Sequence, residues 1–361
     1  MSTIEALPDE ILVKILSFIS FKELCRFRQI TRRMWTLSQD KHFWKKIKIP
    51  STVVPGHLMQ DIIRFDVKYL SMPYCTIKPY WLGGFLEGRN SNLIHLNVAG
   101  CNGNDELLAD LVSSSKSLKS LDLSESRFNL VSMVVEKIPM ENSLTAIDFS
   151  MMGNLMIAND QDKLDFKSIK IVVDKCRNLT DLILYDTHLS FKSIAYICNN
   201  LTNKMLRLDF CKERVMDIDI MALANQCKNL EYLNLSDTWV TYSIVPTIVL
   251  AWSGTLLDLS LPQTIGLDLD LDEDEPDETT LEDFKTMIGS VTNLKYLHIG
   301  NWCGDMAEIT GNSYVEDKKH IKKLEKLFPG LTINLSPFSN DSPAKTNPSY
   351  LFLNIENSYT E

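Results

Sequence analysis

The chain has 361 residues, 45% of them apolar, and its 37 basic and 47 acidic side chains give a net charge of −10. An acidic chain is a poor match for a phosphate backbone, so nucleic acid is excluded as the expected partner. No apolar run reaches the ~18 residues that a membrane span needs, and the first ten residues hold no basic region of a secretory signal. We therefore expect an intracellular protein, in the nucleus or the cytoplasm, that does not bind membranes.

The sequence holds no pattern typical of a catalytic or metal site. Its eight cysteines include no pair at Cys-x-x-Cys spacing, and without an export signal they should stay reduced. The six histidines lack His-Glu-x-x-His spacing, and neither a Gly-x-Ser-x-Gly elbow nor a phosphate-binding loop occurs. A ligase that carried ubiquitin itself would need an activated cysteine thiolate, and nothing but position in the sequence would single out Cys211 or Cys303 for that role. We expect no cofactor, no metal and no catalytic residue.

The first fifty residues predict a small helical domain. Pro8 suits the start of a helix, and Asp9 and Glu10 place negative charge at its amino end. Apolar residues then recur at helical spacing: Ile11, Leu12, Ile15, Leu16 and Ile19. Two further apolar runs, over 21–30 and 34–44, complete three expected helices. A unit of this size cannot bury so much apolar surface against itself, so we expect a partner to cover part of it.

These residues resemble an F-box. The resemblance rests on Leu7-Pro8, the apolar ladder to Phe18, Leu24, Ile30, Arg32-Arg33, Leu37, Asp40 and Trp44. The chain departs from the family at Thr31 and Met34, where the family usually has Cys and Trp. The resemblance implies that the first helices insert into a Skp-type adaptor, which joins the protein to a cullin-RING ubiquitin ligase. The residues it assigns to adaptor binding are Leu7, Pro8, Ile11, Leu12, Ile15, Leu16, Phe18 and Leu24. The alternative is a helical cap for the segment that follows.

A repeated pattern fills most of the remaining chain. The segment 50–80 is rich in proline and is expected to be irregular, with one degenerate repeat at Ile62, Phe65 and Val67. The pattern L-x-x-L-x-L then occurs eight times, beginning at Leu93, Leu118, Leu144, Leu179, Met205, Leu230, Leu256 and Leu294. Five of its seven intervals are 25 or 26 residues, which is within the leucine-rich-repeat range.

Two apolar periods inside each repeat predict its structure. The end of each pattern alternates like a strand, whereas segments such as 106–112, 169–173 and 218–223 have helical spacing. Strands stack ~4.8 Å apart and helices ~8 to 10 Å apart, so the stack must curve with its strands inside. We therefore predict an α/β horseshoe with a parallel sheet on its concave face, helices outside, and a three-helix F-box at the amino end.

Cys176 and Cys227, just before the next repeats, resemble the cysteine-containing subtype that commonly accompanies an F-box. The chain is similar to the F-box/leucine-rich-repeat family, whose members are non-catalytic substrate receptors. The order of its segments resembles members that receive cyclin-kinase inhibitors, which implies a phosphorylated target and a small accessory phosphate-binding protein. One alternative stays open, an intracellular repeat scaffold without a ligase role. Glycosylation acceptor motifs such as Asn178-Leu-Thr would suggest an extracellular receptor, but most of them overlap the repeat strands and no signal peptide precedes them, so we interpret them as coincidence.

The expected domains are an F-box at 1–50, a repeat solenoid at 51–333 and a tail at 334–361 that folds back on the solenoid. Long intervals between repeats predict exposed loops near 153–162 and at about 266–280. Between Ile265 and Asp283 there are ten carboxylates and no Lys or Arg. Such a segment repels itself and buries little, so a solvated loop is expected.

Polar residues within the repeats suggest a target-binding wall. The residue between the last two apolar positions should point to the concave face, as should the residue before them. We assign to substrate binding Asp122, Asp148, Asp181, Arg207, Asp209, Tyr232, Tyr296 and Trp302. The carboxylates of successive repeats would attract a basic segment. Neither row is expected to be needed for the fold.

Overall fold

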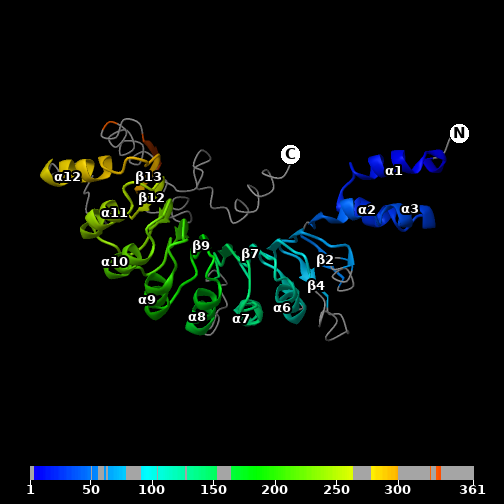
Figure 1. The fold of residues 1–361 in the computed structure, drawn as a ribbon, viewed down its shortest axis with the longest axis horizontal. Coiled ribbons are helices and arrows are strands. Elements are labelled where there is room, and N and C mark those ends of the chain that lie inside the picture. The colour runs from blue at the N-terminus through cyan, green and yellow to red at the C-terminus, as the bar shows by residue number, and fades with distance from the viewer. Residues whose placement is uncertain are drawn as a thin grey trace, which may run out of the picture. The chain divides into compact units, whose positions relative to one another are not determined.

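We describe a computed structural model of the chain (Figure 1). It describes residues 4–49, 51–55, 61, 64–78, 91–103, 105–126, 128–152, 164–262, 278–299, 326 and 331–334. The chain forms two compact units, residues 1–144 and 145–361. The predicted acidic segment up to residue 277, the loop at 153–162, Trp302 and the tail beyond residue 334 lie outside the described residues.

The amino end of the first unit is helical. After a 3-10 turn at Ile4–Ala6 come α1 (Asp9–Leu16), α2 (Phe21–Phe27), α3 (Arg32–Leu37) and α4 (Lys41–Trp44). The expected third helix is divided in two, so the prediction of three helices is wrong. The division falls at Asp40, whose side chain accepts a hydrogen bond from the His42 N–H and begins α4.

The rest of the first unit is built on parallel strands. The larger sheet has the order β1 (Lys46–Lys48), β3 (Tyr69–Ser71), β5 (His95–Asn97) and β7 (Ser120–Asp122). The smaller has β2 (Val53–Val54), β4 (Thr76–Ile77) and β6 (Asn102–Gly103). Helices α6 (Asp105–Ser114) and α7 (Phe128–Lys137) pack against each other.

The segment 50–80 is more regular than its prolines suggested. Of the degenerate repeat predicted at Ile62, Phe65 and Val67, Ile62 lies outside the described residues. The strand of this repeat is β3, which holds Leu70, within the buried set Val67, Leu70 and Met72. A still earlier repeat is formed by Trp44, Ile47 and Ile49, so the last residues of the helical domain also supply the first strand of the sheet.

The second unit repeats one strand and one helix. Its parallel strands, in sheet order, are β8 (Ala146–Asp148), β9 (Asp181–Ile183), β10 (Arg207–Asp209), β11 (Tyr232–Asn234), β12 (Asp258–Leu261), β13 (Tyr296–Ile299) and β14 (Thr332–Asn334). The helices are α8 (Phe166–Lys175), α9 (Phe191–Asn200), α10 (Asp217–Gln226), α11 (Val245–Trp252) and α12 (Glu278–Gly289), with a 3-10 turn at Tyr242–Ile244.

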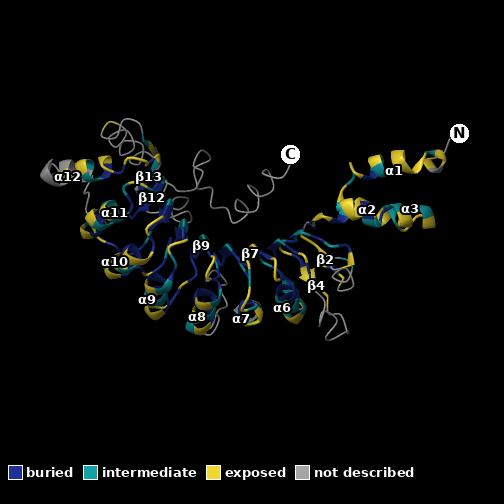
Figure 2. Ribbon diagram, in the orientation of Figure 1, coloured by how far each residue is buried: buried dark blue, intermediate teal, exposed yellow. Residues whose placement is uncertain are grey.

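All eight copies of L-x-x-L-x-L form strands, so the predicted strand positions are confirmed. Wherever their burial is described, the second and third apolar residues of the copies, such as Leu208 and Phe210, are buried. Helices α8 to α11 lie side by side along the strands of the second unit, and each turns an exposed face outward (Figures 1 and 2). The chain is thus α/β with parallel sheets and amino-terminal helices, while the horseshoe curvature stays a prediction. Within the described residues, no helix has the length and apolar character to cross a membrane.

Candidate functional site

The helical domain has a small core centred on Trp44. Its ring is fully buried, stacks on Phe65 with centroids 4.1 Å apart, and meets the edge of Phe21 at 5.4 Å. The indole N–H donates to the Ser38 carbonyl at 2.7 Å, so the polar atom of this buried side chain is satisfied. Arg28 lies over the Trp44 ring, 5.0 Å from its centroid. The helices are therefore anchored to the first repeat through one aromatic cluster.

Side-chain caps fix where the helices begin. Ser20 accepts a hydrogen bond from the Glu23 N–H while the Glu23 carboxylate accepts from the Ser20 N–H, which forms a capping box for α2. The Ser20 hydroxyl also donates to the Glu23 carboxylate at 2.8 Å, and this bond, together with the one from the Ser20 N–H, lowers the pKa of Glu23. The Arg33 guanidinium donates to Asp9 at 2.6 and 2.9 Å and to the Leu7 carbonyl at 2.7 Å. Because this contact joins α3 to the start of α1, it fixes how α1 is presented.

The predicted adaptor-binding residues divide into two sets. Leu12, Leu16 and Leu24 are buried in the domain's own core. Pro8, Ile11 and Phe18 are exposed, Phe18 by 81%, while Leu7 and Ile15 are half-buried. On α1, the apolar spacing therefore selected residues of two faces. Leu12 and Leu16 face the core of the domain, and Ile11 faces solvent.

Two exposed apolar side chains were missing from the predicted set. Ile30, after α2, is 66% exposed, and Trp35 on α3 is 42% exposed. Ile30 belongs to the apolar run that suggested the second helix, and Trp35 departs by one position from the family pattern. With Ile4, Ile11 and Phe18 they are the large apolar side chains that the described part of the helical domain leaves exposed.

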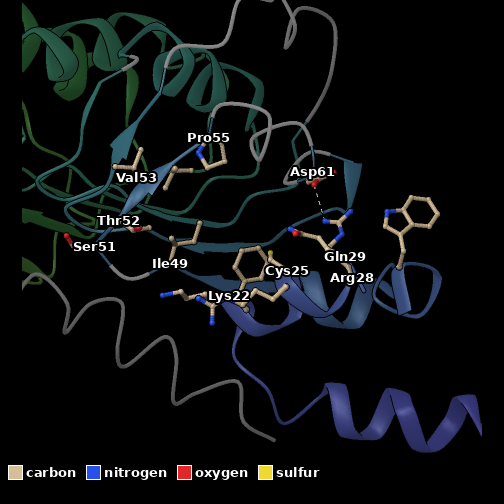
Figure 3. Close-up of a pocket in the computed structure, with 14 residues that line it drawn as sticks. Lys22, Cys25, Arg28, Gln29, Ile49, Ser51, Thr52, Val53, Pro55 and Asp61 are labelled. Carbon is tan, nitrogen blue, oxygen red and sulfur yellow. Dashed lines mark hydrogen bonds and ion pairs between the residues drawn. The ribbon is translucent and has the colours of Figure 1, made fainter. Parts of the chain in front are cut away.

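A pocket of about 630 Å³ lies where α2 meets the segment after β1 (Figure 3). Apolar side chains of Phe21, Cys25, Ile49 and Val54 line it, together with the polar side chains Lys22, Arg26, Arg28, Gln29, Ser51, Thr52 and Asp61. Arg28 is held by Asp61 at 3.2 Å. Lys22 and Arg26 are exposed. The pocket is thus apolar inside and basic at its edge, which suits an apolar segment that carries acidic residues.

Residues 4–50 match the F-box-like family. The matched segment covers α1 to α4 and β1, and it includes the exposed apolar side chains Ile11, Phe18, Ile30 and Trp35. The chain therefore carries an F-box-like domain. F-box domains typically bind Skp-type adaptors, and proteins that carry them are generally non-catalytic adaptors of ubiquitin ligases.

The second predicted site consists of side chains on the repeat strands. Strand register places Asp209 opposite Ile183 and Asn234, and Arg207 opposite Asp181 and Tyr232, so the predicted rows exist in the second unit. Asp148 begins the first of these rows, opposite Ile183. In the first unit, Asp122 lies opposite Asn97.

The expectation that these rows are dispensable for the fold is wrong for three of the aspartates. Asp122, Asp148 and Asp209 are at most 1% exposed. The carboxylates of Asp122 and Asp148 accept from the N–H and hydroxyl of Ser124 and Ser150 at 2.7–3.0 Å. Asp209 accepts from the Cys211 N–H at 2.9 Å, from Asn234 at 3.0 Å and from Tyr232 at 3.2 Å. These carboxylates hold the turn after each strand.

The remaining predicted substrate residues are less enclosed. Arg207 and Asp181 are half-buried, with 3.7 Å between the guanidinium Nε and the carboxylate. Tyr232 is buried, Tyr296 is half-buried, and Trp302 lies outside the described residues. Burial raises the pKa of Asp122 and of Asp209 to about 6. The substrate-binding role of this set stays a proposal.

The cysteine thiols and the possible metal-binding side chains bear on whether the chain could carry out chemistry itself. Of the seven cysteines in the described part of the chain, only Cys25 is more than slightly exposed. Burial raises the pKa of Cys211, which opposes formation of the thiolate that a ubiquitin-carrying cysteine needs. Among the described residues, no group of three or more His, Cys, Asp and Glu side chains could hold a metal ion.

Proposed function

We propose that this protein is the substrate-recognition subunit of a ubiquitin ligase built from a Skp-type adaptor and a cullin. The observation that carries the proposal is the set of exposed apolar side chains, Ile11, Phe18, Ile30 and Trp35, within the segment that matches the F-box-like family. Covering such side chains contributes ~1.5 to 3 kcal/mol each when they become fully buried. The pocket beside α2 extends this surface with an apolar interior and a basic edge.

In this proposal the repeats bind the target. Strands and helices that recur with a period of 25 or 26 residues are typical of the leucine-rich-repeat family, whose curved sheet binds proteins. Catalysis then comes from geometry, because the bound target lysine is held near a charged conjugating enzyme. Similarity to the S-phase kinase-associated F-box protein supports a cell-cycle inhibitor as target, presented with an accessory phosphate-binding protein. The wall formed by Asp181, Arg207 and Tyr296 is the proposed contact.

The adaptor contact can be tested without damaging the core. Leu12 is fully buried, so an aspartate there would unfold the domain. We expect Ile11→Asp with Phe18→Asp to weaken binding of purified Skp-type adaptor at least ~100-fold, because two apolar contacts worth ~3 kcal/mol together are lost. Isothermal titration calorimetry measures the change.

Met140→Asp is the matched control, because Met140 is 75% exposed and lies outside the matched segment. It should leave adaptor affinity unchanged. If the double variant keeps its circular dichroism spectrum and still binds the adaptor as tightly as the wild type, the F-box contact is refuted. A repeat scaffold without ligase function would then be the better assignment.

A further inference from the structure

An exposed group of aromatic and basic side chains lies on three consecutive repeats of the second unit. Phe191 begins α9, Arg214 and Met216 follow β10, and Trp239 follows β11. Phe191 is 42% exposed, Met216 38% and Trp239 56%, and Arg214 is also exposed. We call these four residues the aromatic patch. Large aromatic side chains are seldom left exposed together unless a partner covers them.

Arg214 lies over both rings of the patch, about equally far from each. Its guanidinium carbon is 6.0 Å from the Phe191 centroid and 5.9 Å from the Trp239 centroid, and the two rings are 5.6 Å apart. Within the described residues, Arg214 makes no ion pair with a carboxylate. A guanidinium that is oriented by ring stacking keeps its N–H groups available for a bidentate contact with a carboxylate.

The loops that carry the patch are fixed before any partner binds. The buried carboxylate of Glu213, next to Arg214, accepts from the N–H groups of Thr187, His188 and Leu189 at 2.6–2.8 Å. It thereby ties the loop before Phe191 to the loop of Arg214. The Trp239 N–H donates to the Val215 carbonyl at 3.0 Å, which fixes the third loop. Preorganisation of this kind lowers the entropy lost on binding.

The charge of this edge of the repeats points to the chemistry of the partner. Lys192 lies beside Phe191 in the sequence, and its ammonium is 4.1 Å from the Phe166 centroid, which repeats the pairing of an exposed cation with an aromatic ring. The carboxylate of Asp217, the first residue of α10, accepts hydrogen bonds from the Thr241 N–H and hydroxyl and from the Ser243 hydroxyl. The two exposed cations over rings, Arg214 and Lys192, complement an acidic partner.

We propose that the aromatic patch is a docking site for an acidic peptide segment of a protein partner, with Asp or Glu side chains next to a bulky apolar residue. The carboxylate binds Arg214, and the apolar side chain packs on Trp239 and Met216. Trp and Arg at the centre of a patch are the residue types that dominate interface energies. The site is separate from the F-box surface and does not depend on the ligase role.

The test is selection of random short peptides displayed on phage against the full-length chain, followed by fluorescence anisotropy with the synthesised peptides. We expect selected peptides to combine Asp or Glu with Leu, Phe or Trp. Arg214→Ala and Trp239→Ala should each weaken their binding at least about tenfold, and added salt should weaken binding to the wild type. A peptide with Gln in place of its Glu residues should bind as weakly as the Arg214 variant does.

Lys116→Ala and Met140→Ala are the controls, since both residues are exposed and lie in the first unit. Unchanged binding in these two variants supports the site. Selection of peptides without acidic residues, or equal losses in the control and patch variants, would overturn it. Tighter binding of a phosphoserine peptide than of its Glu counterpart would also overturn it, because the site would then be one for phosphate.

Discussion

At the scale of single residues, buried carboxylates determine how neighbouring repeats are joined. Glu213 is 1% exposed and accepts three backbone hydrogen bonds from the loop of the preceding repeat. An unsatisfied buried donor costs ~1 to 3 kcal/mol. A single side chain therefore satisfies donors that would otherwise oppose the packing of β9 and β10, and it supports the loop that carries Phe191.

We expect Glu213→Ala to destabilise the protein by at least ~3 kcal/mol, because three buried N–H groups lose their acceptor. Glu213→Gln should cost less, since its carbonyl oxygen still accepts from Thr187 and His188. Urea denaturation followed by circular dichroism measures both losses. Equal stability of the Ala variant and the wild type would contradict the role of this carboxylate.

The same residue gives stability a dependence on pH. Burial raises the pKa of Glu213 from 4.5 to about 8, although its backbone hydrogen bonds act in the opposite direction. The folded state thus binds a proton that the unfolded state releases, so this contribution to stability is present below pH 4.5 and is lost as the pH rises through about 8. Gln does not titrate, so raising the pH from 4.5 to about 8 should lower the free energy of unfolding of the wild type relative to that of Glu213→Gln. Denaturation at several pH values in that interval measures it, and a constant difference would refute the shift.

At the scale of the repeat, one turn follows the strands. Asn97, Asp122, Asp148, Asp209 and Asn234 all accept a hydrogen bond from the N–H two residues later. In each of these and two further repeats, the residue three positions after the one that points to the concave face has a left-handed backbone conformation. These left-handed residues are Tyr74, Gly100, Glu125, Met151, Asp186, Lys212 and Asp237. A short polar side chain and a left-handed residue together reverse the chain from strand toward helix. The first role of these Asn and Asp side chains is therefore to stabilise the turn after each strand.

Asn and Asp make the same turn contact in different repeats, so an Asp-to-Asn substitution can remove the charge while it keeps the turn. Because Asn makes the turn contact in two repeats, we expect Asp122→Asn with Asp148→Asn to keep the melting temperature within about 4 °C of the wild type. Adding Asp209→Asn should cost ~1 kcal/mol more, because an NH2 group replaces the oxygen that accepts from Tyr232 and Asn234. The triple Ala variant should lose at least ~3 kcal/mol, about 1 for each lost contact. Differential scanning calorimetry distinguishes them. Target capture that is unchanged in the Asn variant, with an unchanged salt dependence, would refute an acidic wall.

Sequence periodicity predicted the strands better than it predicted the site. Each L-x-x-L-x-L copy forms a strand because the same leucines that set the pattern also fill the core. The strands β1 and β3 were missed because Trp44, Ile47 and Met72 replace leucines and prolines surround them. For the adaptor surface, helical spacing selects Leu12 and Ile11 alike, and only packing against α3 decides which of them is buried. The aromatic patch could not be predicted from the sequence, because its residues come from three different repeats and only the fold brings them together.

At the scale of the whole molecule, two surfaces with different chemistry lie in different compact units. The F-box surface is apolar with a basic pocket and belongs to residues 1–144, whereas the aromatic patch belongs to residues 145–361. They share no residue. Because the two surfaces share no residue, their binding free energies should add, and each partner should exchange without releasing the other.

Independence predicts a reciprocal result with the purified adaptor and a selected acidic peptide. Ile11→Asp with Phe18→Asp should lose the adaptor and bind the peptide with wild-type affinity, and Arg214→Ala should do the reverse. Titration of each ligand with the other already bound should leave both affinities within about threefold, which is close to the ~0.5 kcal/mol within which independent sites add. Loss of the peptide in the F-box variant, at unchanged circular dichroism, would show that the two surfaces are coupled.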